Sequence, residues 1–230
     1  MIPLYHDFSD QTVLVFGGGR IGARKARRFA SEATVVVVSP DFGEYDFGGA
    51  ELVRARPGPD DVATWVDRVG PALVVAATDS DDVNDAIAAA GRERGLLVNH
   101  ADSSVGGDTD ESDAPGAGGV GDVVVPATVD DGDVRVAIST GGRSPALAKH
   151  LRERLEAELD GADGMAALTA ELRAELKASD LDPSARRDAI RAVVREPSVW
   201  KALRTGESNP RREATRVIRN TTGGDQWTRE

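Results

Sequence analysis

The chain has 230 residues, of which 40% are hydrophobic, and it carries a formal charge of −11 at neutral pH. It contains no cysteine, which excludes disulfide bonds, thiolate metal sites and a cysteine nucleophile. The sequence has no apolar run long enough to span a membrane, no signal-peptide pattern at its N-terminus and no basic face, so we expect a cytoplasmic protein without membrane or nucleic-acid partners.

The first half of the chain alternates strand and helix patterns. Short apolar runs predict strands at residues 13–16, 35–38, 52–54, 73–76 and 96–98. The stretches between them predict helices at residues 22–31, 60–68 and 82–94. This alternation is typical of βαβ units with a parallel sheet, which binds ligands at the carboxyl ends of its strands. The residues at these ends are Gly17, Ser39, Thr78 and Asn99.

A glycine motif follows the first predicted strand. Gly17, Gly19 and Gly22 have the spacing G-x-G-x-x-G and lie just before a predicted helix. The first glycine permits the tight turn, the second lets a pyrophosphate approach the backbone, and the third lets the helix pack closely on the sheet. The helix N-terminus then offers free N–H groups to the phosphates. The motif predicts a dinucleotide site; a purely structural turn is the alternative.

The charged residues are mostly acidic, and this bears on the salt concentration in which the protein works. Arginine supplies nearly all of the positive charge, since the chain has only four lysines, and aspartate is abundant. A strongly hydrated acidic surface suits a halophilic protein that works in high salt. An acidic proteome without salt adaptation gives the same composition, so both explanations stay open.

The second half of the chain begins with a segment that has little to bury. Residues 103–121 are rich in glycine, aspartate and serine, and we expect a mobile loop there, either a passive insertion or a functional lid. A hairpin is expected from strands at 122–129 and 134–138, and helices at 146–158, 165–178, 183–194, 199–203 and 211–218. Asp182 is the expected N-cap of the third of these helices. The predicted domains are 1–121, 122–160 and 161–230.

Several phrases of the sequence resemble one family. They are Gly-Gly-Gly-x-Ile-Gly-x-Arg-Lys-Ala at 17–26, Val-Ala-Ala-Thr-Asp at 75–79, Val-Asn-His-Ala-Asp at 98–102, and Ile-Ser-Thr-Gly-Gly-Arg-Ser-Pro-Ala-Leu-Ala at 138–148. The chain resembles the precorrin-2 dehydrogenases and the N-terminal module of sirohaem synthases. The resemblance implies an α/β Rossmann-type parallel sheet, a dimerisation segment and a small C-terminal helical domain. It also implies a homodimer that oxidises precorrin-2 to sirohydrochlorin with NAD, and in some members inserts Fe²⁺.

The resemblance also implies cofactor contacts. The expected cofactor-binding residues are Gly17, Gly18, Gly19, Arg20, Ile21, Gly22, Pro40, Asp41, Thr78 and Asn99. Asp41 has the sequence distance of a ribose-gripping acid but stands past the expected strand end, so its role stays open. No arginine follows Asp41, whereas Glu44 and Asp46 do, which favours NAD over NADP. Asp79 is either a helix cap, a role that Ser80, Asp81 and Asp82 also suit, or a cofactor contact.

The resemblance places the catalytic carboxylate at Asp102. Dehydrogenation removes a hydride and a proton, and a partly desolvated carboxylate can accept the proton. The alternative is an ordinary loop aspartate. His100 is either a proton shuttle or a structural histidine, and no cluster with metal-ligand spacing is expected.

The phrase after the hairpin is the expected substrate-binding segment. Precorrin-2 carries eight carboxylates, which arginine side chains bind well. The expected substrate-binding residues are Ser139, Gly141, Gly142, Arg143, Ser144 and Lys149. A solvated helix face is the alternative. For the whole chain, the rival to a dehydrogenase, with or without ferrochelation, is an NAD-sensing Rossmann module that regulates a partner without catalysis.

Overall fold

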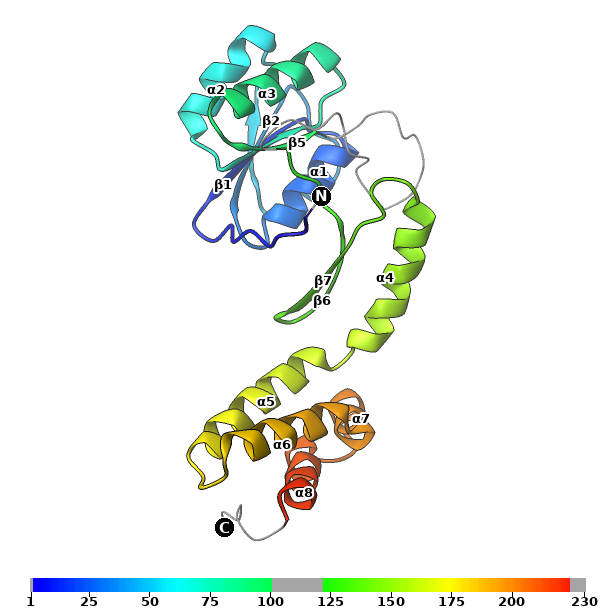
Figure 1. Ribbon diagram of the computed structural model, residues 1–230. Coiled ribbons are helices and arrows are strands. Elements are labelled where there is room, and N and C mark those ends of the chain that lie inside the picture. Colours follow the sequence, from blue (N-terminus) through cyan, green and yellow to red (C-terminus); the bar gives the residue numbers. More distant parts are fainter. Residues whose placement is uncertain (1, 101–121, 224–230) are drawn as a thin grey trace. The chain divides into compact units, whose positions relative to one another are not determined.

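The computed structural model describes residues 2–100 and 122–223 (Figure 1). Asp102 and the predicted loop at 103–121 therefore lie outside the described residues. The chain divides into two compact units. The first comprises Met1–Pro126 and Ser139–Ala146, and the second comprises Ala127–Ile138 and Leu147–Glu230.

The first unit is built on a five-stranded parallel sheet. Its strands are β1 (Thr12–Phe16), β2 (Thr34–Ser39), β3 (Glu51–Arg54), β4 (Leu73–Ala76) and β5 (Leu97–His100). They pair in the order β3-β2-β1-β4-β5, and every pairing is parallel. All five predicted strands are confirmed, within about two residues at their ends.

Helices cover both faces of this sheet (Figure 1). They are α1 (Arg20–Phe29), α2 (Val62–Val69), which follows the short 3₁₀ turn η1 (Pro59–Asp61), and α3 (Asp81–Glu93). Alternate residues of β1 point to opposite faces: Val13 and Val15 pack with α1, and Leu14 and Phe16 pack with α2 and α3. The central strands are apolar on both sides because both sides are covered.

The chain returns to the sheet at residues 122 and 123. Asp122 forms a parallel bridge with Val98 of β5, and the Val123 N–H donates to the Val98 carbonyl at 2.8 Å. Arg92 of α3 makes a bidentate ion pair with Asp122 at 3.1 and 2.9 Å, which raises the pKa of Arg92. The predicted strand at 122–129 is therefore wrong in its first half, because these residues pair with β5 and not with the hairpin.

The second unit consists of a hairpin and helices. The hairpin pairs β6 (Ala127–Asp131) with β7 (Val134–Ile138) in antiparallel register. The helices are α4 (Pro145–Leu159), whose first two residues belong to the first unit, α5 (Ala162–Lys177), α6 (Pro183–Arg195), α7 (Pro197–Thr205) and α8 (Pro210–Thr222). Buried side chains such as Leu172, Val193 and Ile218 form one core among α5 to α8.

Capping confirms one prediction in this unit. The Asp182 carboxylate accepts hydrogen bonds from the N–H groups of Ser184 and Ala185 at 2.7 and 3.2 Å, so Asp182 is the N-cap of α6. These bonds stabilise the ionised carboxylate and lower the pKa of Asp182.

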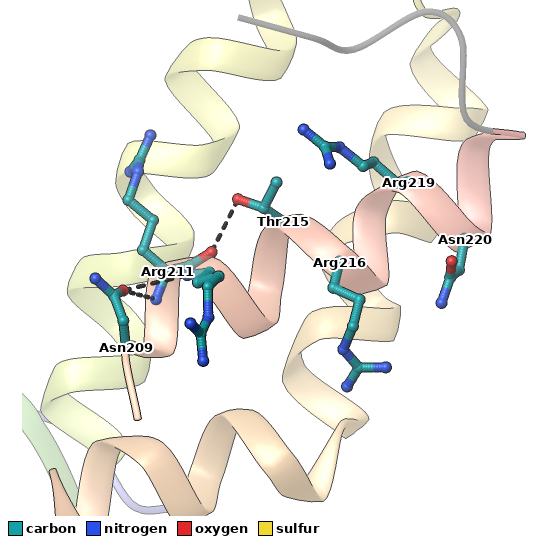
Figure 2. Close-up of a pocket in the computed structure, with 7 residues that line it drawn as sticks. Asn209, Arg211, Thr215, Arg216, Arg219 and Asn220 are labelled. Carbon is teal, nitrogen blue, oxygen red and sulfur yellow. Dashed lines mark hydrogen bonds between the residues drawn. The ribbon is translucent and has the colours of Figure 1, made fainter. Parts of the chain in front are cut away.

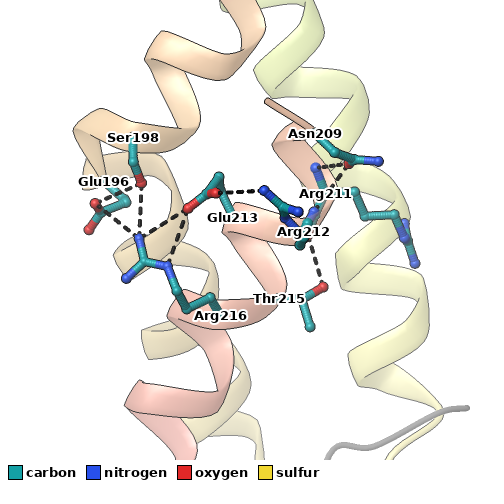
Figure 3. A network of polar contacts seen from close by, with 8 residues as sticks. All are labelled: Glu196, Ser198, Asn209, Arg211, Arg212, Glu213, Thr215 and Arg216. Carbon is teal, nitrogen blue, oxygen red and sulfur yellow. Dashed lines mark hydrogen bonds and ion pairs between the residues drawn. The ribbon is translucent and has the colours of Figure 1, made fainter. Parts of the chain in front are cut away.

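Arginines tie α8 to its neighbours. Arg211 binds Glu171 of α5 at 3.1 Å and also pairs with Glu175 of the same helix. Arg216 donates to Ser198 at 3.1 Å and to Glu213 at 3.2 Å, with Glu196 at 3.8 Å (Figure 3). Figure 2 shows the outer face of α8, where Arg219 points away from this network. Arg211 and Arg216 therefore hold α8 against α5 and α7.

Candidate dinucleotide-binding site

A cleft of about 740 Å³ lies at the carboxyl ends of the strands of the first unit. The segments that follow β1, β2, β3 and β4 each contribute to its walls. The lining residues are Gly17, Gly18, Gly19, Arg20, Ile21, Val38, Ser39, Pro40, Asp41, Arg56, Pro57, Ala77, Thr78, Asp79, Ser80 and Val83. The cleft therefore brings together eight of the ten residues expected to bind the cofactor.

The glycine motif has a different constraint at each position. Gly17 has φ +117°, and a Cβ atom there would lie 2.1 Å from the Ala77 carbonyl oxygen. A Cβ atom on Gly22 would lie 1.9 Å from the Gly17 carbonyl oxygen, so Gly22 permits the close packing of α1. A Cβ atom on Gly19 would meet nothing within 4 Å, although Gly19 lines the cleft. Gly17 and Gly22 are needed for the fold, and Gly19 leaves space for a ligand.

The start of α1 suits an anion. Gly19 is the N-cap of α1, and no side chain caps this helix. The first N–H groups of a helix have no partner within the helix, and its dipole favours negative charge there. Arg20 adds a guanidinium at the same place and lines the cleft. Together with the open space at Gly19, these groups fit the pyrophosphate of a dinucleotide.

Thr78, at the end of β4, is held by a buried amide. The Thr78 N–H and hydroxyl donate to Oδ1 of Asn84 at 3.0 and 2.8 Å, and Nδ2 of Asn84 donates to the Thr78 carbonyl at 3.0 Å. Asn84 belongs to α3, and its side chain is buried. Asn84 was part of no expected site, although it lies one helical turn beyond the Thr78–Asp79 phrase. Its role is to fix the cleft wall.

Ser80, not Asp79, caps α3. The Ser80 hydroxyl accepts from the Val83 N–H at 3.4 Å, and Ser80 is the N-cap residue. The capping interpretation of Asp79 is therefore wrong, because α3 begins one residue later than such a cap requires. Asp79 instead lies exposed in the cleft lining.

Two arginines lie near the end of the cleft that follows β2: one lines the cleft, and the other pairs with a lining residue. Arg54 Nη1 lies 3.3 Å from Asp41 Oδ1, and Arg56 lines the cleft. Both come from β3 and the segment after it, which pairs beside β2. Glu44 and Asp46 do not line the cleft, and the Asp46 carboxylate accepts from the Gly48 N–H at 2.8 Å. The expectation considered only the residues that closely follow Asp41 in the sequence, and the parallel pairing of β2 with β3 brings Arg54 to Asp41 from further along the chain.

The remaining expected residues lie elsewhere. Asn99 of β5 is buried outside the cleft lining; its Nδ2 donates to the Val123 carbonyl at 2.9 Å, and its Oδ1 has no hydrogen-bond partner within the described residues. Half-buried His100 ends β5, two residues before Asp102 in sequence. The catalytic assignment of Asp102 and the cofactor contact of Asn99 stay predictions.

The expected substrate segment is an ordered turn before α4. Gly141 and Gly142 have φ +63° and +74°, and the Thr140 hydroxyl donates to the Ser144 carbonyl at 3.1 Å. Arg143 is exposed at this turn. Lys149 is exposed on α4, in the second unit, so the expected substrate residues are divided between the units. Their role stays a prediction.

Two absences concern the described ranges alone. No helix within residues 2–100 and 122–223 is both long and apolar enough to cross a bilayer. The same ranges hold no group of three or more histidine, aspartate or glutamate side chains arranged to bind a metal ion.

The strand order, the glycine motif and the cleft define a Rossmann-type dinucleotide-binding protein. Residues 4–110 match an NAD(P)-binding family model, and residues 131–158 match the model for the central region of a sirohaem biosynthesis protein. The precorrin-2 dehydrogenase of Methanosarcina barkeri is 30% identical over 211 residues, which cover 88% of this chain and 86% of that protein. The chain belongs to the precorrin-2 dehydrogenase family.

Longer relatives match over part of their length. The siroheme synthases of Methylococcus capsulatus and Pseudomonas entomophila are 31% and 34% identical, and the match covers 88% of this chain but 40% and 41% of those proteins. The solved structure of SirC, precorrin-2 dehydrogenase, has a TM-score of 0.61 at 23% identity and covers 96% of this chain and 100% of that chain. This structural likeness supports the fold.

Proposed function

We propose that the chain oxidises precorrin-2 to sirohydrochlorin with NAD as the hydride acceptor. The observation that carries this proposal is the cleft at the carboxyl ends of the sheet, in which Gly19 and the uncapped start of α1 leave space for a pyrophosphate. Membership of the precorrin-2 dehydrogenase family supplies the substrate.

Each cleft element has a part in holding the cofactor. Gly19, Arg20 and the first N–H groups of α1 bind the pyrophosphate, and Thr78, braced by Asn84, faces the cleft beside it. Bound NAD supplies the hydride acceptor. The exposed Asp41 carboxylate is available to the adenosine ribose, because its contacts with the Phe42 N–H and Arg54, within the part of the chain that the structure describes, both use Oδ1.

Asp102 is the proposed proton acceptor. It stands two residues after His100 in the sequence, and His100 ends β5 at the same edge of the sheet as the cleft-forming segments. Partial desolvation raises the pKa of a carboxyl group, which makes its carboxylate a better proton acceptor. The substrate carboxylates are assigned to Ser139, Gly141, Gly142, Arg143, Ser144 and Lys149, which offer two cationic side chains and glycine backbone.

The proposal includes a homodimer in which α4 contacts a second copy. Leu147, Leu151, Leu155 and Leu159 recur every four residues along α4, yet Ala148 is the one buried residue of this helix. Leu147 is 48% exposed. Leu151, Leu155 and Leu159 are half-buried, and a leucine stripe of this exposure is suited to a partner helix. Leu151→Asp should convert the dimer to a monomer in light scattering, whereas Glu153→Lys, on the exposed side, should not.

The test is the reaction itself. Purified protein is mixed with precorrin-2 and NAD, and sirohydrochlorin is followed by its absorbance. Wild type should turn over, and Asp102→Asn should lose at least about a hundredfold in kcat while the Kd for NAD stays within about twofold. Undiminished oxidation by this variant removes Asp102 from the mechanism. NAD binding with no oxidation by wild type supports a sensor and overturns the proposal.

Iron insertion is tested in the same assay. With Fe²⁺ added as a substrate after oxidation is complete, a ferrochelatase speeds conversion of sirohydrochlorin to sirohaem above the rate without protein. A rate equal to the protein-free control limits the chain to dehydrogenation.

A further inference from the structure

Where β2 and β3 end, the cleft has a recess lined by Pro40, Asp41, Arg56 and Pro57. Ser39 of β2 pairs with Arg54 of β3, and the Ala55 N–H donates to the Ser39 carbonyl at 3.0 Å. The two strands therefore end side by side. The segment that holds Pro40 and Asp41 and the segment that holds Arg56 and Pro57 line the same cleft.

The recess carries more positive than negative charge. Asp41 is the acidic residue that follows β2, and Arg54 lies 3.3 Å from its Oδ1 and 3.5 Å from the Pro40 carbonyl oxygen. The Arg54 guanidinium also lies 5.9 Å from the centre of the Phe42 ring, which restricts where it points. Arg56 has no ion-pair partner among the described residues. Arg54 thus pairs with the Asp41 carboxylate, and Arg56 is a second cation that lines the same cleft as Asp41.

This charge pattern meets the requirement of a phosphorylated ribose. In Rossmann folds an acidic side chain after the second strand binds the ribose 2′-hydroxyl of NAD, and a nearby arginine accommodates the 2′-phosphate of NADP. Asp41 partly neutralised by Arg54 repels a phosphate less than a free carboxylate would. Arg56 is then available to bind the phosphate directly.

We infer that the chain binds NADP as well as NAD, with Arg56 as the residue that recognises the 2′-phosphate and Arg54 as the residue that moderates the charge of Asp41. The inference rests on the proposed dinucleotide function of the cleft. The segment after β3, which is distant in sequence from the glycine motif, then determines whether NADP binds as well as NAD.

Isothermal titration calorimetry with NAD and NADP on the full chain tests this inference. The Kd for NADP should be within about tenfold of the Kd for NAD in wild type. Arg56→Gln should raise the Kd for NADP at least about tenfold and change the Kd for NAD less than about twofold, because a charge-assisted contact to the 2′-phosphate is lost. Asp41→Asn should shift the ratio of the two Kd values toward NADP.

Two controls separate the recess from general effects. Arg68→Gln removes an arginine of α2 that stacks on Trp65 at 5.0 Å outside the cleft lining, and both Kd values should stay unchanged. Arg20→Gln alters the pyrophosphate end and should weaken both dinucleotides equally. Circular dichroism of each variant confirms folding, and Asp41→Asn still tests the inference if Arg56→Gln does not fold.

The outcomes are distinguishable. Tight binding of NAD with a Kd for NADP more than about tenfold higher overturns the inference and leaves the proposed function standing. An equal loss of both dinucleotides in Arg56→Gln also overturns it. Failure of wild type to bind either dinucleotide overturns the proposed function itself.

Discussion

The side-chain amide of Asn84 binds Thr78 through both its oxygen and its nitrogen. Oδ1 accepts hydrogen bonds from the Thr78 N–H and hydroxyl, and Nδ2 donates to the Thr78 carbonyl. Because Asn84 is enclosed in α3, it fixes the wall of the cleft from behind without facing a ligand itself. Asn84→Ala should therefore lower stability by about 2 kcal/mol and raise the Kd for NAD about tenfold. Chemical denaturation and calorimetry measure the two effects.

Asp85→Ala, on the exposed side of the same helix, is the control and should change neither stability nor the Kd for NAD. An unchanged Kd for NAD in Asn84→Ala would show that the cleft wall does not depend on the hydrogen bonds of Asn84.

The glycines of the motif should respond differently to the same substitution. Gly22→Ala forces a methyl group against the Gly17 carbonyl oxygen and should cost about 3 kcal/mol of stability or prevent folding. Gly19→Ala has room, and its extended backbone suits alanine, so the loss of stability should be limited to about 1 kcal/mol, because alanine is a poorer N-cap than glycine. The new methyl group faces the cleft, so the Kd for NAD should rise at least about tenfold. Full NAD affinity in Gly19→Ala would place the pyrophosphate elsewhere.

Lys25 should make stability depend on pH. Burial in α1, together with Arg24 and Arg28, lowers the pKa of Lys25 well below its usual 10.5. Between the lowered pKa and 10.5 the unfolded chain binds more protons than the folded chain, so stability rises with pH across this window and is lost as the pH falls through it. The contribution is at most about 1.4 kcal/mol per pH unit.

Lys25→Met should abolish this contribution. Urea unfolding at about pH 7.5 and about pH 9.5 gives the difference for wild type and variant. Lys201→Met removes an exposed lysine that pairs with Glu207 at 3.0 Å and should leave the wild-type difference in place. Equal pH dependence in wild type and Lys25→Met would refute the depressed pKa.

The ion pairs of Arg211 should stabilise α8 in a salt-dependent way. Arg211 joins α8 to Glu171 and Glu175 of α5 at partly exposed positions. Arg211→Ala should therefore cost about 0.5–1 kcal/mol at low salt and less in molar salt, because salt screens exposed charges. Amide hydrogen exchange in α5 and α8 measures the local effect. Arg219→Ala is the matched control on the same helix, and an identical loss at both salt concentrations would point to packing in place of charge.

Local patterns predicted much of this molecule. The strands and helices followed from apolar periodicity, and the Asp182 cap followed from a side chain that binds backbone groups two and three residues ahead. The glycine motif indicated the cleft because each glycine serves a constraint within one strand–turn–helix unit. Ser80 in place of Asp79 as the cap shows the limit: several adjacent residues were chemically suitable, and the register of α3 on the sheet selected one.

The sequence by itself determined the secondary structure, the dinucleotide motif and the family resemblance, since each depends on neighbours along the chain. Only the tertiary structure decided that residues 122 and 123 pair with β5, that Asn84 braces Thr78, and that Arg54 and Arg56 stand at the recess beside Asp41. Parallel pairing is the physical reason for the first and the third of these, because it brings the carboxyl ends of strands together whatever length of chain separates them. The Asn84 contact depends instead on how α3 packs after the end of β4. The charges around the cleft therefore depend on which strands pair at the sheet edge, and the order of residues along the chain does not show this pairing.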